Sequence, residues 1–133
     1  MIQVTYTSDA SSSMGSGDVF KIIEASAKNN AKNDLTGFLV FSGGRFFQFL
    51  EGPENAIDAL LEKLEKDERH SNMKVLSRSS AVQRSFPKWR MKRLASDFEA
   101  ELIEENLPEL KDAPSQVKRL LTEFLEPSAR LRA

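Results

Sequence analysis

The side chains of this sequence that are best suited to chemistry are a phenol and several carboxamides on otherwise apolar faces. Tyr6 is the single tyrosine, and it belongs to an alternating segment in which Ile2, Val4 and Tyr6 share one side. Gln48 interrupts the run of large apolar residues in RFFQFLEG. Because an amide buried without a hydrogen-bond partner costs roughly 1–3 kcal/mol, Gln48 must have a bonding partner.

Two asparagines end a helical pattern nearer the N-terminus. In residues 17–31 the apolar stripe runs from Val19 through Ser26 to Asn29 and Asn30. One interpretation is a C-terminal helix cap, because Asn tolerates the left-handed backbone conformation that often ends a helix. The other interpretation is that the core-facing stripe presents side-chain amides to a ligand.

Each of these residues, taken alone, has an ordinary structural explanation. Gln48 fits a satisfied amide in a β core, and Tyr6 fits a half-buried aromatic whose hydroxyl reaches water or a carbonyl. If both side chains face the helices, they converge with the asparagines on an apolar cleft, the usual construction of a small-molecule site. Amides and a phenol suit a flat heteroaromatic ligand such as a flavin ring edge. Hydrolysis is not favoured, because the pattern positions no pair of carboxylates for acid–base catalysis.

The elements that position these residues follow from hydrophobic periodicity. We predict strands at residues 2–7, 35–42, 45–51, 73–82 and 88–94, and helices at 17–31 and from Pro53 to about residue 67. A Ser/Gly loop is expected at 8–18, and the Gly-Gly pair within 42–45 predicts a hairpin turn. The order β-α-β-β-α-β-β predicts an α+β fold, a ferredoxin-like mixed sheet with two helices on one face.

The other face of this sheet also needs a cover, because the strand at 45–51 is apolar on both sides. Its two sides carry Phe46, Gln48 and Leu50, and Phe47 and Phe49. Residues 97–133 contain two helical patterns separated by Asp112-Ala113-Pro114. We expect this C-terminal helical pair to cover the second face or to form a subunit interface, and the pattern does not choose between them.

Composition excludes several classes of function. The chain has 133 residues, which fits one domain, and a net charge of −1 from 19 basic and 20 acidic residues, so no nucleic-acid footprint is expected. It has no cysteine, which removes disulfides and thiolate metal sites and fits a reducing, cytoplasmic location. No apolar stretch approaches the ~20 residues of a membrane span, and MIQVTYTSDA does not read as a signal peptide.

Taken together, these segments resemble the BLUF domain, a blue-light sensor that uses FAD. The resemblance covers about residues 1–96 and leaves 97–133 as a helical extension for capping, dimerisation or signal output. It rests on the early strand with Tyr6 and on four segments in family order and spacing: KNNAKNDLTGFLVF, GGRFFQFLEGP, KDERH and FPKWRM.

The resemblance implies a role for each central residue. Tyr6 matches the tyrosine that bonds the glutamine and donates an electron to the excited flavin, and Gln48 matches the glutamine between that tyrosine and flavin N5 and O4. Asn30 matches the asparagine that holds the O4/N3 edge, with Asn29 at the neighbouring position. Ser26 belongs to the same stripe and is expected to contact the cofactor.

More distant positions are also implied by the resemblance. Arg69 and His70 match basic residues near the ring carbonyl or the ribityl-phosphate side, and Lys63 stands where some relatives have an arginine. Trp89 and Met91 match a switch pair that faces one side of its strand; plain core packing is the alternative. Between them, Arg90 replaces a residue that is often small and polar in the family.

The resemblance further implies a mechanism without net chemistry, so the chain is not expected to be an enzyme. Light moves an electron and a proton from Tyr6, the charge recombines, and Gln48 rotates or tautomerises, which shifts the absorption to the red. Strand five and the C-terminal helices are expected to relay this change. Because 97–133 is too short for a cyclase or phosphodiesterase domain, we expect a short stand-alone sensor acting on an unidentified downstream protein partner or through its own homo-oligomer.

Three alternatives stay open at this point. A ferredoxin-like protein-interaction module without flavin has the same topology, and so has an acylphosphatase-like hydrolase. The hydrolase is disfavoured because the loop after the first strand has no arginine. A flavin oxidoreductase would need a base or a hydride acceptor, to which nothing in the sequence points.

Overall fold

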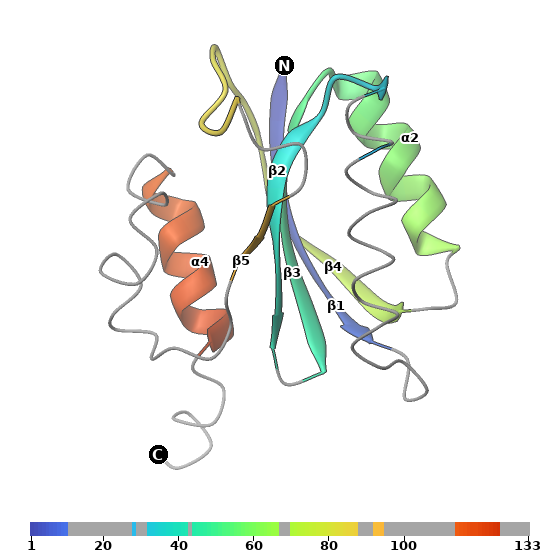
Figure 1. Ribbon diagram of the computed structural model, residues 1–133, viewed down its shortest axis with the longest axis vertical. Helices are drawn as coiled ribbons and strands as arrows, with labels where there is room; N and C mark the ends of the chain where they lie inside the picture. Colours follow the sequence, from blue (N-terminus) through green and yellow to red (C-terminus); the bar gives the residue numbers. More distant parts are fainter. Residues whose placement is uncertain are drawn as a thin grey trace.

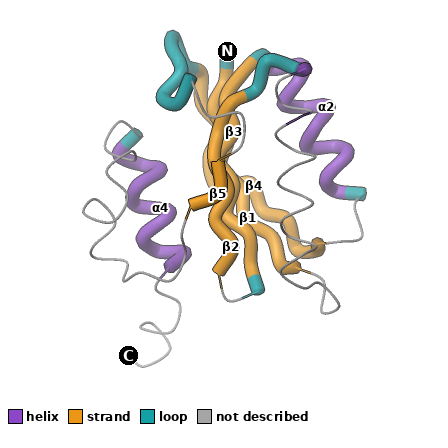
Figure 2. Tube along the Cα trace, viewed as in Figure 1, coloured by secondary structure: helices purple, strands orange, loops and turns teal. Residues whose placement is uncertain are grey.

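The computed structural model describes residues 1–10, 28, 32–42, 44–66, 70–87, 92–94 and 114–125. Its elements are β1 (Ile2–Ala10), β2 (Thr36–Ser42), β3 (Arg45–Gly52), α2 (Glu54–Glu65), β4 (His70–Ser80), β5 (Lys92–Leu94) and α4 (Ser115–Leu125). Figure 1 shows α2 on one side of the sheet and α4 on the other, and Figure 2 shows the same three layers coloured by type of element.

The sheet has the strand order β4-β1-β3-β2-β5. The β1–β3, β1–β4 and β2–β3 pairs are antiparallel, and β5 runs parallel to β2. This mixed sheet confirms the predicted ferredoxin-like α+β fold with an added fifth strand. Strands β1 and β3 lie side by side at its centre, as the predicted topology allows.

Two strands begin or end three residues beyond their predicted bounds, and β4 ends at Ser80 rather than at residue 82. Strand β1 continues to Ala10, although residues 8–18 were expected to form a loop, because Ser8 and Asp9 pair with β3 and Ala10 pairs with β4. Strand β4 begins at His70 rather than at residue 73. Both added segments consist mainly of polar residues, so they show no hydrophobic alternation. They are strands because the neighbouring strand supplies the backbone hydrogen-bond partners.

Two apolar clusters fill the layers on either side of β3. The cluster under α2 contains Val4, Tyr6, Leu50 and Ile57, and the cluster under α4 contains Phe47, Phe49, Leu121 and Phe124. The alternation predicted for strand three is therefore confirmed. Helix α4 covers the second face of the sheet, which is one of the two arrangements that the sequence left open for the C-terminal segment. Of the predicted helix at 17–31 only Lys28 is described, and it is helical; the first C-terminal helical pattern lies outside the described residues.

The hairpin and a glycine contact set the spacing of the central strands. Ser42 pairs directly with Arg45 across the turn, and Gly44 in that turn has a φ of 76°. Within β2, a Cβ built on Gly37 would lie 1.9 Å from the carbonyl oxygen of Phe49. A residue with a side chain therefore cannot occupy position 37 unless β2 and β3 move apart.

We expect Gly37→Ala to lower the free energy of unfolding by about 3 kcal/mol or more, because the new methyl group collides with backbone that cannot move alone. Gly44→Ala is the matched control. It also requires a positive φ, but its Cβ meets no atom within 4 Å, so a loss of only about 1 kcal/mol is expected. Urea denaturation measures both, and equal losses would show that the contact with Phe49 has no consequence.

A charged pair closes the β1–β3 ladder at the end next to the hairpin turn. Asp9 lies opposite Arg45, whose Nε is 3.1 Å from Asp9 Oδ1, and Asn72 Nδ2 donates to Asp9 Oδ2 at 2.8 Å. The Asn72 hydrogen bond, followed by the hydrogen bond and charge of Arg45, lowers the pKa of Asp9 below its ordinary 3.8, against the opposing effect of partial burial. The Arg45 guanidinium also lies 5.4 Å from the ring centre of Phe124, so this group links the sheet to α4.

Asp9→Asn is expected to lower the free energy of unfolding by less than about 1 kcal/mol near pH 6, because both charged side chains are partly exposed. A lowered folded-state pKa gives stability that is present above the unfolded value of 3.8 and is lost as the pH falls through the folded value. The difference between wild type and variant should therefore shrink below pH 3.8. Urea titrations across this range measure it, and a constant difference would argue against a role for the Asp9 charge.

Candidate functional site

Tyr6 and Gln48 form a hydrogen-bonded pair at the centre of the sheet. They are direct partners in the β1–β3 ladder, and the Tyr6 hydroxyl donates to Gln48 Oε1. Their exposed fractions are only 4% and 5%. The bonding partner that burial demands for Gln48 is thus the single tyrosine of the chain.

Strand geometry places both side chains on the α2 face. Val4 pairs with Leu50 and Tyr6 with Gln48, and side chains two residues apart on a strand point the same way. Leu50 and Tyr6 belong to the same buried cluster as Ile57 of α2. The phenol and the carboxamide consequently lie in an apolar layer, where a hydrogen bond is electrostatically stronger than in water.

The rung that contains the pair crosses the whole sheet. From β4 to β5 its members are Val75, Tyr6, Gln48, Leu39 and Arg93. Gln48 therefore has strands on both sides, which hold its backbone, and only its side chain is able to rearrange. A carboxamide carries an acceptor oxygen and a donor nitrogen, so turning it over exchanges the group that faces the phenol.

The other predicted site residues are only partly described. Lys63 is exposed in the last turn of α2, outside the buried layer that holds Tyr6 and Gln48. His70 opens β4, where its backbone pairs with Ala10. The six remaining positions lie outside the described residues: Ser26, Asn29, Asn30, Arg69, Trp89 and Met91. Their contributions stay predictions.

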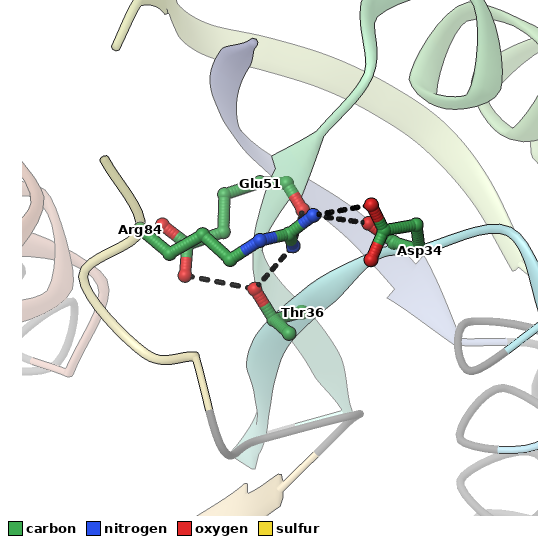
Figure 3. A network of polar contacts seen from close by, with 4 residues as sticks. All are labelled: Asp34, Thr36, Glu51 and Arg84. Atoms are coloured by element: carbon green, nitrogen blue, oxygen red, sulfur yellow. Dashed lines mark hydrogen bonds and ion pairs between the residues drawn. The ribbon is translucent and has the colours of Figure 1, made fainter. Parts of the chain in front are cut away.

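A second polar cluster lies on the opposite face and was missed by the sequence analysis. Glu51 is fully buried there, and Figure 3 shows Thr36, Arg84 and Asp34 around it. Arg84 Nη1 donates to Thr36 Oγ1 at 2.9 Å and to the Glu51 carbonyl oxygen at 3.2 Å, and Nη2 donates to the Asp34 carbonyl oxygen at 2.6 Å. The available signal was alternation: residues 47, 49 and 51 share one face, so a carboxylate ends an aromatic row.

The described part of the chain contains no helix that is long and apolar enough to span a membrane. It also contains no group of three or more His, Asp or Glu side chains placed to hold a metal ion.

Comparison with known proteins identifies the family of this chain. The sequence model of the BLUF family, described as sensors of blue-light using FAD, matches residues 1–92. Over 120 residues, or 90% of this chain, the sequence is 30% identical to the photoactivated adenylate cyclase subunit beta of Euglena longa. That match covers 13% of the Euglena protein, so the chain spans only a small part of this relative's length.

Solved structures agree in fold. BlrP1 of Klebsiella pneumoniae, solved with FMN and cyclic diGMP, superimposes with a TM-score of 0.82 at 28% identity, over 97% of this chain and 35% of that one. BlsA in its photo-activated state superimposes with a TM-score of 0.74 at 27% identity, over 93% of both chains. With the buried phenol–carboxamide pair and the family match over most of its length, this chain belongs to the BLUF family of sensors of blue light using FAD.

Proposed function

We propose that the Tyr6–Gln48 pair is the light-sensitive element of this chain and acts as a two-position hydrogen-bond switch beside bound FAD. The observation that carries the proposal is the buried hydrogen bond from the Tyr6 hydroxyl to Gln48 Oε1 on the central rung. It places a donor and an invertible amide together where water does not compete. The flavin-free interaction module and the hydrolase are not favoured, because the family match names FAD.

The chemistry of the described residues fits a flavin. A ring edge with alternating acceptors and donors needs partners of both kinds, and the Gln48 carboxamide offers both on one group. Asn29, Asn30 and Ser26 would complete the polar side of the site, with Lys63, Arg69 and His70 toward the ribityl and phosphate side. The FMN in the BlrP1 structure supports a flavin in this fold. When bound, FAD supplies the absorption of blue light and the acceptance of an electron.

The protein contributes the two stable arrangements. Tyr6 gives up an electron and its hydroxyl proton and then recovers both, so no net chemical change remains. Gln48 ends either rotated, with its other polar atom toward the phenol, or as the tautomer, in which its oxygen carries the proton. Two arrangements of one side chain that differ by only a few kcal/mol satisfy the requirement for a bistable signalling element. The apolar layer and the fixed backbone confine the rearrangement to the side chains.

We further propose that the signal leaves through strand β5 and the C-terminal helices. The rung from Gln48 through Leu39 reaches Arg93 of β5. On the other face Phe47, the residue beside Gln48, contacts Phe124 of α4 with ring centres 5.4 Å apart. Gln48 is therefore connected to β5 through strand pairing and to α4 through the neighbouring Phe47, and these are the two candidate outputs. Trp89 and Met91, which precede β5, are the proposed switch pair on this route.

On this proposal, residues 1–96 are the photosensor and 97–133 are the capping, dimerisation or output extension. The likeness to BlsA, which was solved in its photo-activated state, supports a light response of this sensor. The receiver of the signal would be a protein partner or a second copy of the chain. The proposal assigns no catalytic step to the sensor.

The first test compares wild type with Gln48→Leu, both loaded with FAD. Illumination with blue light should move the absorption band of the wild type slightly to the red, and the shift should reverse in the dark. Gln48→Leu should keep FAD, because Leu fills similar space, but lose the normal shift, because it has no atom to exchange. Light-minus-dark difference spectra measure both. A wild type that takes up no FAD, or a variant with a normal photocycle, would refute the assignment.

A second test removes only the hydroxyl of Tyr6. Tyr6→Phe should stay yellow, since the ring still fills the cluster with Ile57 and Leu50, but it should form no persistent red-shifted state. The variant lacks the group that releases and recovers the proton. Absorption followed after a light pulse gives the result, and thermal unfolding confirms that the variant is folded. A complete photocycle in this variant would count against the proposed role of Tyr6.

A further inference from the structure

The Glu51 carboxylate binds the chain between β4 and β5 to the end of the sheet. Oε1 accepts from the backbone N–H of Ser85 at 2.7 Å and from Gln3 Nε2 at 3.1 Å. Oε2 accepts from the backbone N–H of Phe86 at 2.8 Å and from Thr36 Oγ1 at 2.9 Å. In all four contacts the partner donates and a Glu51 oxygen accepts.

Neighbouring contacts hold the same short segment. The Phe86 ring is buried and meets Phe38 and Phe49 edge-on, with ring centres 5.5 Å and 5.7 Å apart. Arg84 joins the turn before β2, where its Nη2 lies 3.1 Å from Asp34 Oδ2. Residues 84–86 are therefore bound on three sides, and the backbone N–H groups of Ser85 and Phe86 both donate to Glu51.

The residues attached to Glu51 are connected to Gln48 in two ways, along β3 and through β5. Glu51 and Gln48 belong to the same strand, three residues apart and on opposite faces. After Phe86 the chain returns to the sheet at β5, where Arg93 pairs with Leu39, which in turn pairs with Gln48. The short connection at residues 87–91 thus has one end set by Glu51 and the other set by the Gln48 rung.

We propose that Glu51 is a positioning residue for the light switch: its carboxylate sets where the chain leaves the β4–β5 loop for β5, and thereby the rate of return from the light-induced arrangement. The inference rests on the proposed function of Tyr6 and Gln48. Glu51 lies on the face opposite to that pair and acts through the chain it holds. Without the anchor, residues 84–86 have several positions available, so the arrangement of the dark state is recovered less often and more slowly.

Position 51 needs a carboxylate for a geometric reason. Two consecutive N–H groups require two acceptor oxygens, and glutamine has the same size but only one. Its NH₂ group would face an N–H or hydroxyl donor and leave a buried donor without an acceptor, which is costly. Glu51→Gln therefore breaks one of the two backbone N–H bonds while keeping the volume of the side chain.

The experiment compares dark recovery after a light pulse in FAD-loaded wild type, Glu51→Gln and Thr36→Val. Glu51→Gln should reach the same red-shifted spectrum but recover at least about threefold more slowly. This factor is smaller than the rate change that would follow if the whole free energy of one hydrogen bond to a charged group were lost. Thr36→Val is the matched control. It removes one donor to the same buried carboxylate and one acceptor of Arg84, which keeps its contacts to the carbonyl oxygens of Glu51 and Asp34. Both backbone N–H bonds to Glu51 remain, so its recovery should stay within about twofold of wild type.

A second readout reports the anchor itself. Amide hydrogen exchange in the dark should be faster at Ser85 or at Phe86 in Glu51→Gln, whichever faces the new NH₂ group, and unchanged at both positions in Thr36→Val. A Glu51→Gln protein that recovers at the wild-type rate, or a Thr36→Val protein that is slowed equally, overturns the positioning role. Absence of any red shift in wild type would instead refute the proposed function on which this role rests.

If Glu51→Gln does not fold, Glu51→Asp takes its place. Aspartate keeps the charge but withdraws it by one methylene group from the two N–H donors, so slower recovery than in Thr36→Val is again expected. Recovery of Glu51→Asp at the wild-type rate, with protected Ser85 and Phe86 amides, overturns the proposal as well.

Discussion

The hydrogen bond from the Tyr6 hydroxyl to Gln48 Oε1 joins the two central strands in the middle of the buried layer under α2. Burial makes this bond necessary, because either polar group without a partner would oppose folding at this position. Burial also makes it useful, because the amide has a second bonding atom and a backbone held by strands on both sides. The same contact therefore contributes to the stability of the sheet and provides the element proposed to respond to light.

The two faces of β3 carry residues with different roles. On one face Gln48 lies beside the site proposed for FAD, and on the other Phe47, Phe49 and Glu51 hold α4 and the loop before β5. Alternation along one strand brings these groups within a few residues of each other. A rearrangement on the first face therefore has direct neighbours on the second, without a long chain of intermediates.

Much of the fold could be predicted because its strands alternate and its turns carry glycine. The strands on either side of Gly44 and the two apolar sides of β3 follow directly from the sequence pattern. The family resemblance agrees with the family match over residues 1–92. The ends of β1 and β4 could not be predicted in the same way, because Ser8, Asp9 and His70 are polar and are strand residues only through their partners. Of the site, the need of Gln48 for a partner followed from burial cost and Tyr6 as that partner from the family resemblance, whereas Glu51 looked like the end of a strand.

The sequence by itself determined which side chains are able to exchange hydrogen bonds and which face of each strand is apolar, since residue chemistry and a period of two are local properties. Only the tertiary structure decided that Tyr6 lies opposite Gln48, and that Glu51 accepts the N–H groups of Ser85 and Phe86. Strand register and the attachment of the β4–β5 loop depend on which positions of distant segments meet. The residues next to a side chain in the sequence do not specify its partners across the sheet.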